Sequence, residues 1–307
     1  MRIRRITSSL SPSLVTKAQE TIQSFSASGR LIFYFFSSLL VFSACALLFM
    51  LNASLLVEMP SRGGSHVEGI VGAPRFINPV LAVSDADRDL TSLVYSGLLK
   101  ATPQGEYLPD LAESFTISPD GKTYTFVIRQ NAVFHDAKSV TADDVVFTIA
   151  KTQDPAIKSP ERANWSGITV QKVDTKTVSF TLRQAYAPFI ENLTLGILPK
   201  HLWEAVTDDE FPFSNMNTSP TGSGPFTVST FSRTSSGVPS SYTLKSYSRY
   251  ALGQPYLSTI NFHFYPNEDA LLDALKSGDV TSAGGISPAR ISELSGLRTE
   301  SAPLNRV

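Results

Sequence analysis

The chain has 307 residues, of which 42% are hydrophobic and 17% are charged, and its formal net charge is −1. This length allows one large domain or two smaller ones with a sizeable core. Because there is no global excess of positive charge, nucleic-acid binding has no electrostatic support. The single cysteine, Cys45, excludes an intramolecular disulfide and a cysteine-based metal site.

An uncharged apolar run dominates the N-terminal part of the chain. Residues 1–30 are polar and serine-rich, with five basic residues against one acid, and residues 31–51 read LIFYFFSSLLVFSACALLFML. About 20 apolar residues span the core of a bilayer. Because the basic residues precede the run, the sequence predicts a cytoplasmic segment over 1–30, a transmembrane anchor over 31–51 and an extracytoplasmic remainder.

Two alternatives to an anchor stay open: a cleaved signal peptide and a lipoprotein signal at Cys45. The run is longer than the 7–15 residues usual for the core of a signal peptide. Ala44 is a suitable small residue before the cysteine, but Phe42 is bulky where the lipoprotein pattern has leucine. The residues after Cys45 also stay apolar. These features favour an uncleaved anchor.

The next part of the chain is predicted as a linker followed by a folded domain. Residues 52–67 read as a linker, because they contain Pro60, Gly63 and Gly64 and little periodicity. The domain over 68–307 opens with a short strand at 69–72, and apolar spacing predicts a helix over 85–100.

A β-hairpin and a helix organise the middle of the chain. Apolar and polar residues alternate over 115–128, on either side of the turn sequence Ser118-Pro119-Asp120-Gly121. A helix is predicted from Thr141, with Asp143 and Asp144 as acids at the positive end of its dipole.

The remaining segments continue this mixture of strands and helices. Strands are predicted over 168–173, 177–182 and 260–265, and helices over 187–193 and 268–277. The whole pattern predicts an α/β fold.

The sequence contains no recognisable catalytic, cofactor or metal motif. Gly121-Lys122-Thr123 lacks the earlier glycine of a phosphate-binding loop, since Thr116 stands there. The four histidines are far apart, and no metal or cofactor is predicted. The pair His135-Asp136 lies between a strand and a helix cap, which favours a loop-fixing role over acid–base chemistry.

Residues 110–151 carry a specific resemblance. LAESFTISPDGKTYTFVIR, followed by VFHDAKSVTADDVVFTI, resembles the signature region of the family 5 extracellular solute-binding proteins. These are the oligopeptide-, dipeptide- and nickel-binding receptors of ABC importers. The resemblance continues at 197–203, 222–226 and 253–257. In one departure Ala137 replaces the usual glycine, which is expected to cost about 1 kcal/mol or to mark a shifted loop.

The resemblance implies a lobe of the type II periplasmic-binding-protein fold. It reaches from residue 69 to the end of the chain but covers only the first lobe of a family member. We therefore expect a C-terminally truncated fragment, the alternative being a separate partner chain that supplies the second lobe.

The resemblance also implies where a ligand would touch this lobe. Val83, Ser84 and Asp85 form the segment after the Asn78-Pro79 turn, and in the family this segment lines the cleft and pairs with the ligand backbone. The loop after Ser159-Pro160 contributes as well, and Trp165 would supply an aromatic ring there, although a tryptophan is equally able to fill a core. Gly224, in the turn Gly222-Ser223-Gly224-Pro225, completes the predicted contacts.

The predicted function is a membrane-tethered, extracytoplasmic substrate-binding component of an ABC importer, with peptides as the expected solute. Its partners would be a peptide or related solute, the ABC permease subunits and the membrane. One alternative is a surface interaction module that kept the lobe and lost transport. A hydrolase is a further alternative, and it would require Ser84 or Ser223 beside His135.

Overall fold

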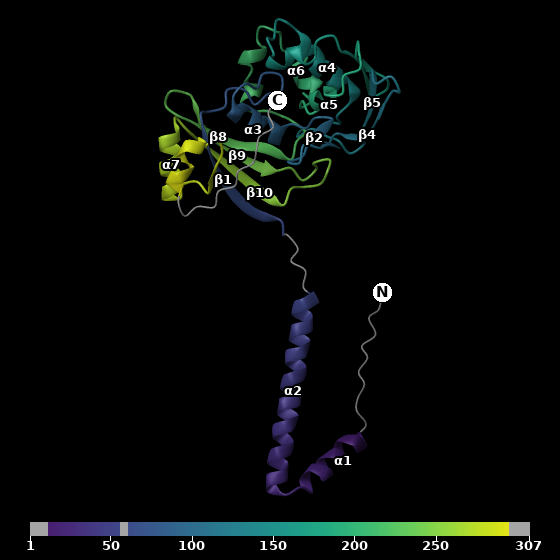
Figure 1. Ribbon diagram of the computed structural model, residues 1–307, viewed down its shortest axis with the longest axis vertical. Coiled ribbons are helices and arrows are strands. Elements are labelled where there is room, and N and C mark those ends of the chain that lie inside the picture. The colour runs from purple at the N-terminus through teal and green to yellow at the C-terminus, as the bar shows by residue number, and fades with distance from the viewer. Residues whose placement is uncertain (1–11, 56–60, 295–307) are drawn as a thin grey trace. The chain divides into compact units, whose positions relative to one another are not determined.

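The computed structural model describes residues 12–55 and 61–294. The chain divides into two units, residues 1–60 and residues 61–307, which are described separately. The first unit holds α1 (Pro12–Gln23) and α2 (Ala27–Leu55) (Figure 1). The stretch Ala27–Asn52 is long and apolar enough to cross a membrane, a property that an N-terminal signal sequence shares. Cys45 lies inside this helix as a free, exposed thiol.

The second unit contains a five-stranded mixed sheet with the order β11-β1-β10-β9-β8 (Figure 1). β1 runs parallel to β10 and β11, whereas β8, β9 and β10 pair antiparallel. Residues 63–67, predicted as linker, belong to β1 because they pair with residues 257–261, far away in the sequence. The strands are β1 (Gly63–Val71), β8 (Phe226–Arg233), β9 (Pro239–Ser246), β10 (Leu257–Tyr265) and β11 (Ser282–Ala283).

Two helices pack against this sheet. Leu90 and Val94 of α3 (Asp85–Val94) share a buried cluster with Tyr242 and Leu244 of β9. α7 (Glu268–Ser277) contacts β1 through a smaller cluster around Leu271. The helix predicted over 85–100 ends at Val94, because the chain turns extended and forms β2 (Leu99–Ala101) with β3 (Tyr107–Pro109).

A second, antiparallel sheet has the order β4-β5-β7-β6. Gly121 in the turn between β4 and β5 has φ 68°, and the predicted hairpin is confirmed. Tyr124, Phe126 and Ile128 are buried as the alternation predicts, whereas Ile117 on the edge strand β4 is 46% exposed. The strands are β4 (Ala112–Ile117), β5 (Thr123–Ile128), β6 (Thr169–Lys172) and β7 (Thr177–Thr181).

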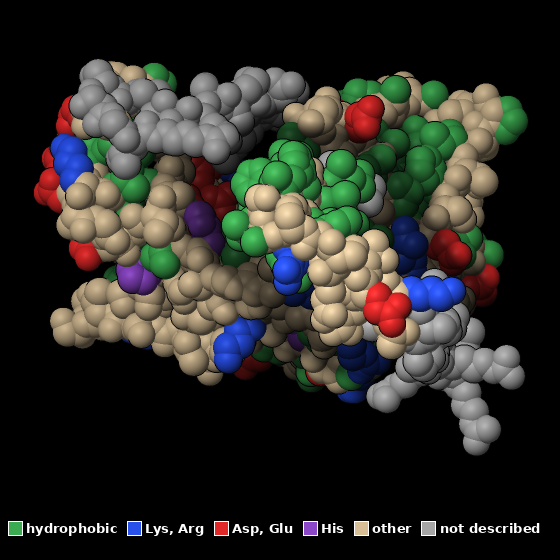
Figure 2. Space-filling view, turned by 90° about the horizontal axis from the view of Figure 1, so that it is seen from below, with side chains coloured by type: hydrophobic (Ala, Val, Ile, Leu, Met, Phe, Trp, Pro, Cys, Tyr) green, Lys and Arg blue, Asp and Glu red, His purple; other side chains and the backbone are tan. Residues whose placement is uncertain are grey.

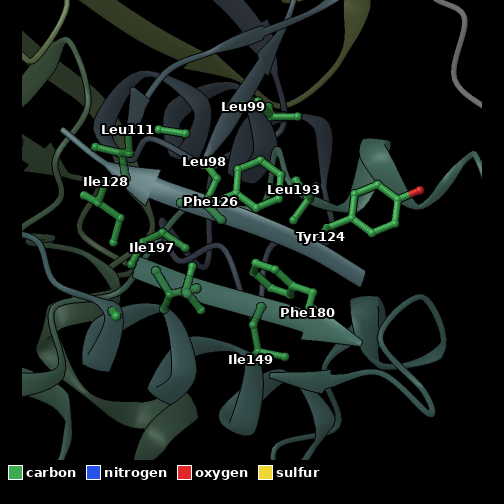
Figure 3. Packing of buried hydrophobic residues seen from close by; sticks show 14 of the residues in the cluster. Leu98, Leu99, Leu111, Tyr124, Phe126, Ile128, Ile149, Phe180, Leu193 and Ile197 are labelled. Carbon is green, nitrogen blue, oxygen red and sulfur yellow. The ribbon is translucent and has the colours of Figure 1, made fainter. Parts of the chain in front are cut away.

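The helix α4 (Ala142–Gln153) packs on this second sheet. Ile149 of α4 joins Phe126 of β5 and Phe180 of β7 in the largest apolar cluster of the described residues (Figure 3). Asp143 and Asp144 lie in its first turn, which confirms their prediction as N-terminal acids.

The carboxylate of Asp144 also joins two helices. Its Oδ2 accepts a hydrogen bond from the Thr141 backbone N–H at 2.8 Å, and its Oδ1 accepts one from the Lys200 N–H at 2.9 Å. Lys200 is the first residue of α6 (Lys200–Trp203). The other short elements are α5 (Phe189–Asn192) and 3₁₀ turns at Pro160–Ala163, Phe211–Phe213, Asn215–Asn217 and Pro288–Leu294. Helices and mixed sheet together confirm the predicted α/β class.

The turn before α4 contains an alanine in a glycine-like conformation. Ala137 has φ 70°, its N–H bonds to the Phe134 carbonyl at 2.8 Å, and the Phe134 N–H bonds to the Lys138 carbonyl at 2.8 Å. This is the geometry of a tight turn followed by a left-handed residue. Alanine therefore occupies a left-handed position that glycine adopts without strain, and the turn itself is kept.

Replacing Ala137 with glycine is expected to raise the free energy of unfolding by about 0.5–1 kcal/mol. Relief of the left-handed strain outweighs the larger entropy that glycine loses on folding. Denaturant unfolding of the detergent-solubilised chain measures the change. Ala156→Gly is the control: its φ is not positive, so the same substitution should lower stability there. A loss of stability in Ala137→Gly would show that the strain is absent.

Candidate functional site

A buried carboxylate supports the loop that leads into α3. Asp87 is 2% exposed, and its two carboxylate oxygens accept hydrogen bonds from four backbone N–H groups. Oδ1 accepts from Arg75 at 2.7 Å and Phe76 at 2.9 Å, and Oδ2 accepts from Val83 at 3.1 Å and Ser84 at 3.0 Å. The Ser84 hydroxyl in return accepts from the Asp87 N–H at 3.1 Å. The start of α3 is thus a capping box whose carboxylate also accepts hydrogen bonds from a second segment of the backbone, residues 75–76.

A buried amide fixes the same loop at the Asn78-Pro79 turn. Asn78 Oδ1 accepts from the Val80 N–H at 2.9 Å, and Asn78 Nδ2 donates to Asn217 Oδ1 at 2.9 Å. Neither asparagine side chain is open to solvent. These buried hydrogen bonds fix the loop in place, and the residues that follow it lie at the surface.

Val83, Ser84 and Asp85 are all exposed, and the Val83 side chain is 58% exposed. Their existing hydrogen bonds limit which of their groups are available to contact a ligand. Because the N–H groups of Val83 and Ser84 already bond to Asp87, those two donors are not free to pair with a ligand backbone. Their role as ligand contacts stays a prediction, carried by the exposed side chains.

Trp165 does not face solvent, contrary to the prediction of an aromatic ring for the ligand. Its side chain is 2% exposed, and its ring lies 6.0 Å from Phe180 and 5.8 Å from Phe189, measured between centroids. The indole fills the gap between the second sheet and α5, where burial of a large aromatic surface stabilises the fold. Its position is that of a core residue.

Gly224 is also buried, and it lies at the opposite end of α3 from Val83–Asp85. Its N–H donates to the Val94 carbonyl at 2.8 Å, and its carbonyl lies 3.1 Å from His135 Nε2. The ten residues of α3 separate the two ends by about 15 Å. The predicted ligand contacts therefore do not come together, and only Val83–Asp85 are exposed.

The His135 ring bonds to both ends of the turn at 222–224, and this pair of contacts forms the His135 bracket. Its Nδ1 lies 3.2 Å from the Gly222 N–H and its Nε2 lies 3.1 Å from the Gly224 carbonyl. The pattern requires a neutral ring with the proton on Nε2. Burial lowers the pKa of His135, while the bond to Gly224 and the charge of Asp136 act in the opposite direction. The geometry supports the loop-fixing role.

The same contacts leave no nucleophile–base pair at His135. Both ring nitrogens are engaged by backbone groups, and the Ser84 hydroxyl bonds to the Asp87 N–H. The Ser223 hydroxyl is buried and has no hydrogen-bond partner among the described residues. Within residues 12–55 and 61–294, no group of three His, Cys, Asp or Glu side chains is placed to hold a metal ion.

The buried neutral His135 predicts a loss of stability in acid. Its folded-state pKa lies below the unfolded value of about 6.5, so the unfolded chain binds more protons and stability falls as the pH drops below about 6.5. His135→Gln should flatten this part of the profile, as measured by denaturant unfolding between pH 5 and pH 8. Every other histidine is present in both proteins, so the difference isolates His135. Parallel profiles would contradict the neutral bracket.

The face of the molecule shown in Figure 2 carries no large area of one charge. Acidic and basic side chains are interspersed there, in keeping with the net charge of −1.

Comparisons with known proteins identify the family that this chain resembles. The model of the bacterial extracellular solute-binding proteins, family 5 (middle region), matches residues 106–303. The chain is 31% identical over 226 residues to the oligopeptide-binding protein AppA of Bacillus subtilis, covering 72% of this chain and 40% of AppA. It is 29% identical over 246 residues to the dipeptide-binding protein of Escherichia coli, covering 73% and 45%.

A solved structure agrees with these sequence matches. AppA from B. subtilis, in complex with a nonapeptide, superposes with a TM-score of 0.66 at 30% identity, covering 72% of this chain and 44% of that one. The fold is that of the type II periplasmic binding proteins. The chain spans less than half the length of each of these relatives. It belongs to the family 5 bacterial extracellular solute-binding proteins.

Proposed function

We propose that this chain captures a peptide for an ABC importer, and that Val83–Asp85 belong to one wall of the capture site. The observation that supports the proposal is the exposed start of α3, which the hydrogen bonds of the buried Asp87 and Asn78 side chains fix in place. The names of these relatives, oligopeptide-binding and dipeptide-binding protein, support a peptide as the solute. The importer's permease subunits are the proposed partners.

Capture of a peptide for transport requires that the peptide is bound but not chemically changed. Small-ligand sites are mostly pre-formed and bury most of the ligand, and binding proteins of this type close around it by a hinge. A pre-formed wall fits the support given by Asp87, because none of its four N–H bonds has to be made when the ligand arrives.

Isothermal titration of the full chain in detergent with defined dipeptides and a nonapeptide tests this function. We expect saturable binding of at least one peptide, weakened by Val83→Asp, which puts a carboxylate on the exposed apolar contact. Val238→Asp is the matched control, since Val238 is 48% exposed on the turn between β8 and β9. Absence of saturable peptide binding would overturn the proposal for this chain.

We further propose that α2 holds the domain at the extracytoplasmic face of the membrane. Its apolar side chains are largely exposed, as with Phe42 at 72% and Phe49 at 73%. An uncleaved anchor predicts an intact mass near 33.4 kDa in the membrane fraction, resistant to carbonate extraction. A mass reduced by the residues that precede Cys45, with Cys45 as a lipidated N-terminus, would instead identify a lipoprotein signal, and loss of the whole apolar run would identify a cleaved signal peptide.

A further inference from the structure

A surface groove lies beside the loop that follows α4. It has a volume of about 860 Å³ and is lined by parts of the segment 153–169 together with residues 181–183 at the end of β7. Pockets for small molecules commonly have volumes of about 300–1,000 Å³. The groove is thus large enough for a small solute.

Three cationic side chains line this groove, and no acidic residue does. They are Lys158, Arg162 and Arg183. Within the described part of the chain, none of the three forms an ion pair with an acidic side chain. Arg162 Nε donates to the Gln153 carbonyl at 3.1 Å, a bond that steadies the guanidinium and involves only one of its three nitrogens.

The carboxylates nearest in sequence are turned to other partners. Asp154 Oδ1 accepts a hydrogen bond from the Ala156 N–H at 2.8 Å. Glu161 Oε2 accepts one from Asn164 Nδ2 at 2.8 Å. Neither carboxylate lines the groove, so the three positive charges there are not neutralised by a lining side chain.

Left-handed backbone occurs at one of these cations and beside another. Lys158 has φ 55°, a left-handed conformation that is uncommon for a residue other than glycine. Gly167 has φ 77°, and a Cβ at that position would come within 3.0 Å of Arg183 Nε. The Arg183 guanidinium therefore lies directly against the glycine backbone.

We propose that this groove binds a small soluble organic acid through its carboxylate or phosphate group. Guanidinium groups match both oxyanions with paired N–H donors, and the ammonium of Lys158 adds a mobile third charge. The hydroxyls of Thr169 and Thr181 supply neutral hydrogen bonds, and Ile168 supplies an apolar wall for the carbon skeleton. The proposal is separate from peptide capture at Val83–Asp85, although the groove includes part of the loop after Ser159-Pro160.

Titration calorimetry of the full chain in detergent, with citrate, glycerol 3-phosphate and uncharged glycerol as probes, tests the groove. We expect saturable binding of citrate or glycerol 3-phosphate but not of glycerol. Preference between the two anions distinguishes a carboxylate ligand from a phosphate ligand. Raising the salt to 1 M should weaken binding at least tenfold, because these exposed charges are screened.

Arg183→Gln should weaken anion binding at least tenfold, whereas Lys245→Gln should leave it unchanged. Lys245 is an exposed cation on β9 that does not line the groove. Thermal unfolding checks that each variant is folded, and Lys158→Gln replaces Arg183→Gln if the latter unfolds early. Failure of both anions to saturate, or equal weakening by Lys245→Gln, would overturn the proposal. Peptide binding is measured separately and does not affect either outcome.

Discussion

Asp87→Ala is expected to lower the free energy of unfolding by about 3 kcal/mol or more, because four backbone N–H groups lose their acceptor in a largely buried setting. Asp87→Asn should cost less, since its one remaining oxygen still serves one pair of donors. Denaturant unfolding of the detergent-solubilised chain gives both values. The loop at 75–84 should also lose its protection from hydrogen exchange in Asp87→Ala.

Asp273→Ala is the control for this prediction. Asp273 is exposed on α7, and its side chain forms no hydrogen bond or ion pair with the residues that the structure describes, so its removal should change stability by less than about 0.5 kcal/mol. Equal losses in Asp87→Ala and Asp273→Ala would show that the carboxylate does not support the α3 loop. The rigid wall proposed for the capture site would then have no foundation.

The second large effect is expected at Gly222. A Cβ at this position would lie 2.0 Å from the Val94 carbonyl oxygen and 3.1 Å from Tyr95 Cδ1. Because the carbonyl belongs to the backbone at the end of α3, the strain has no flexible side chain to absorb it. Gly222→Ala should therefore cost about 3 kcal/mol or prevent folding, and it should disturb the His135 bracket as well.

Gly284→Ala provides the matched comparison. The atom nearest to a Cβ added at Gly284 is a Glu68 carboxylate oxygen at 3.4 Å, which is an ordinary van der Waals contact. That substitution should be close to neutral in the same unfolding assay. A neutral result for Gly222→Ala would mean that the turn at 222–224 does not pack against α3 as the structure describes.

Local patterns predicted the elements whose partners are close in sequence. The hairpin of β4 and β5 follows from alternation on either side of Ser118–Gly121, and the start of α4 follows from Thr141 with its two acids. Residues 63–67 of β1 read as a linker because their stability comes from pairing with β10, about 190 residues later, and no local signal records that contact.

The candidate site was only partly predictable for the same reason. Ser84-Asp85-Ala86-Asp87 is a capping-box pattern that sequence analysis could have found. The bonds from Asp87 to Arg75 and Phe76 depend on how the chain folds back, so they were not visible. Trp165 suits a core or a cleft equally well by residue type, and its packing against Phe180 and Phe189 decides for the core.

The central claim is that a peptide contacts the exposed start of α3. A photoreactive phenylalanine analogue placed at Val83, and separately at Val238 as a control, tests it directly in the full chain. After irradiation with a peptide that binds in calorimetry, mass spectrometry should find the peptide attached at position 83 and not at position 238. Attachment at neither position, or at both equally, would contradict the assignment of Val83–Asp85 to the wall of the capture site.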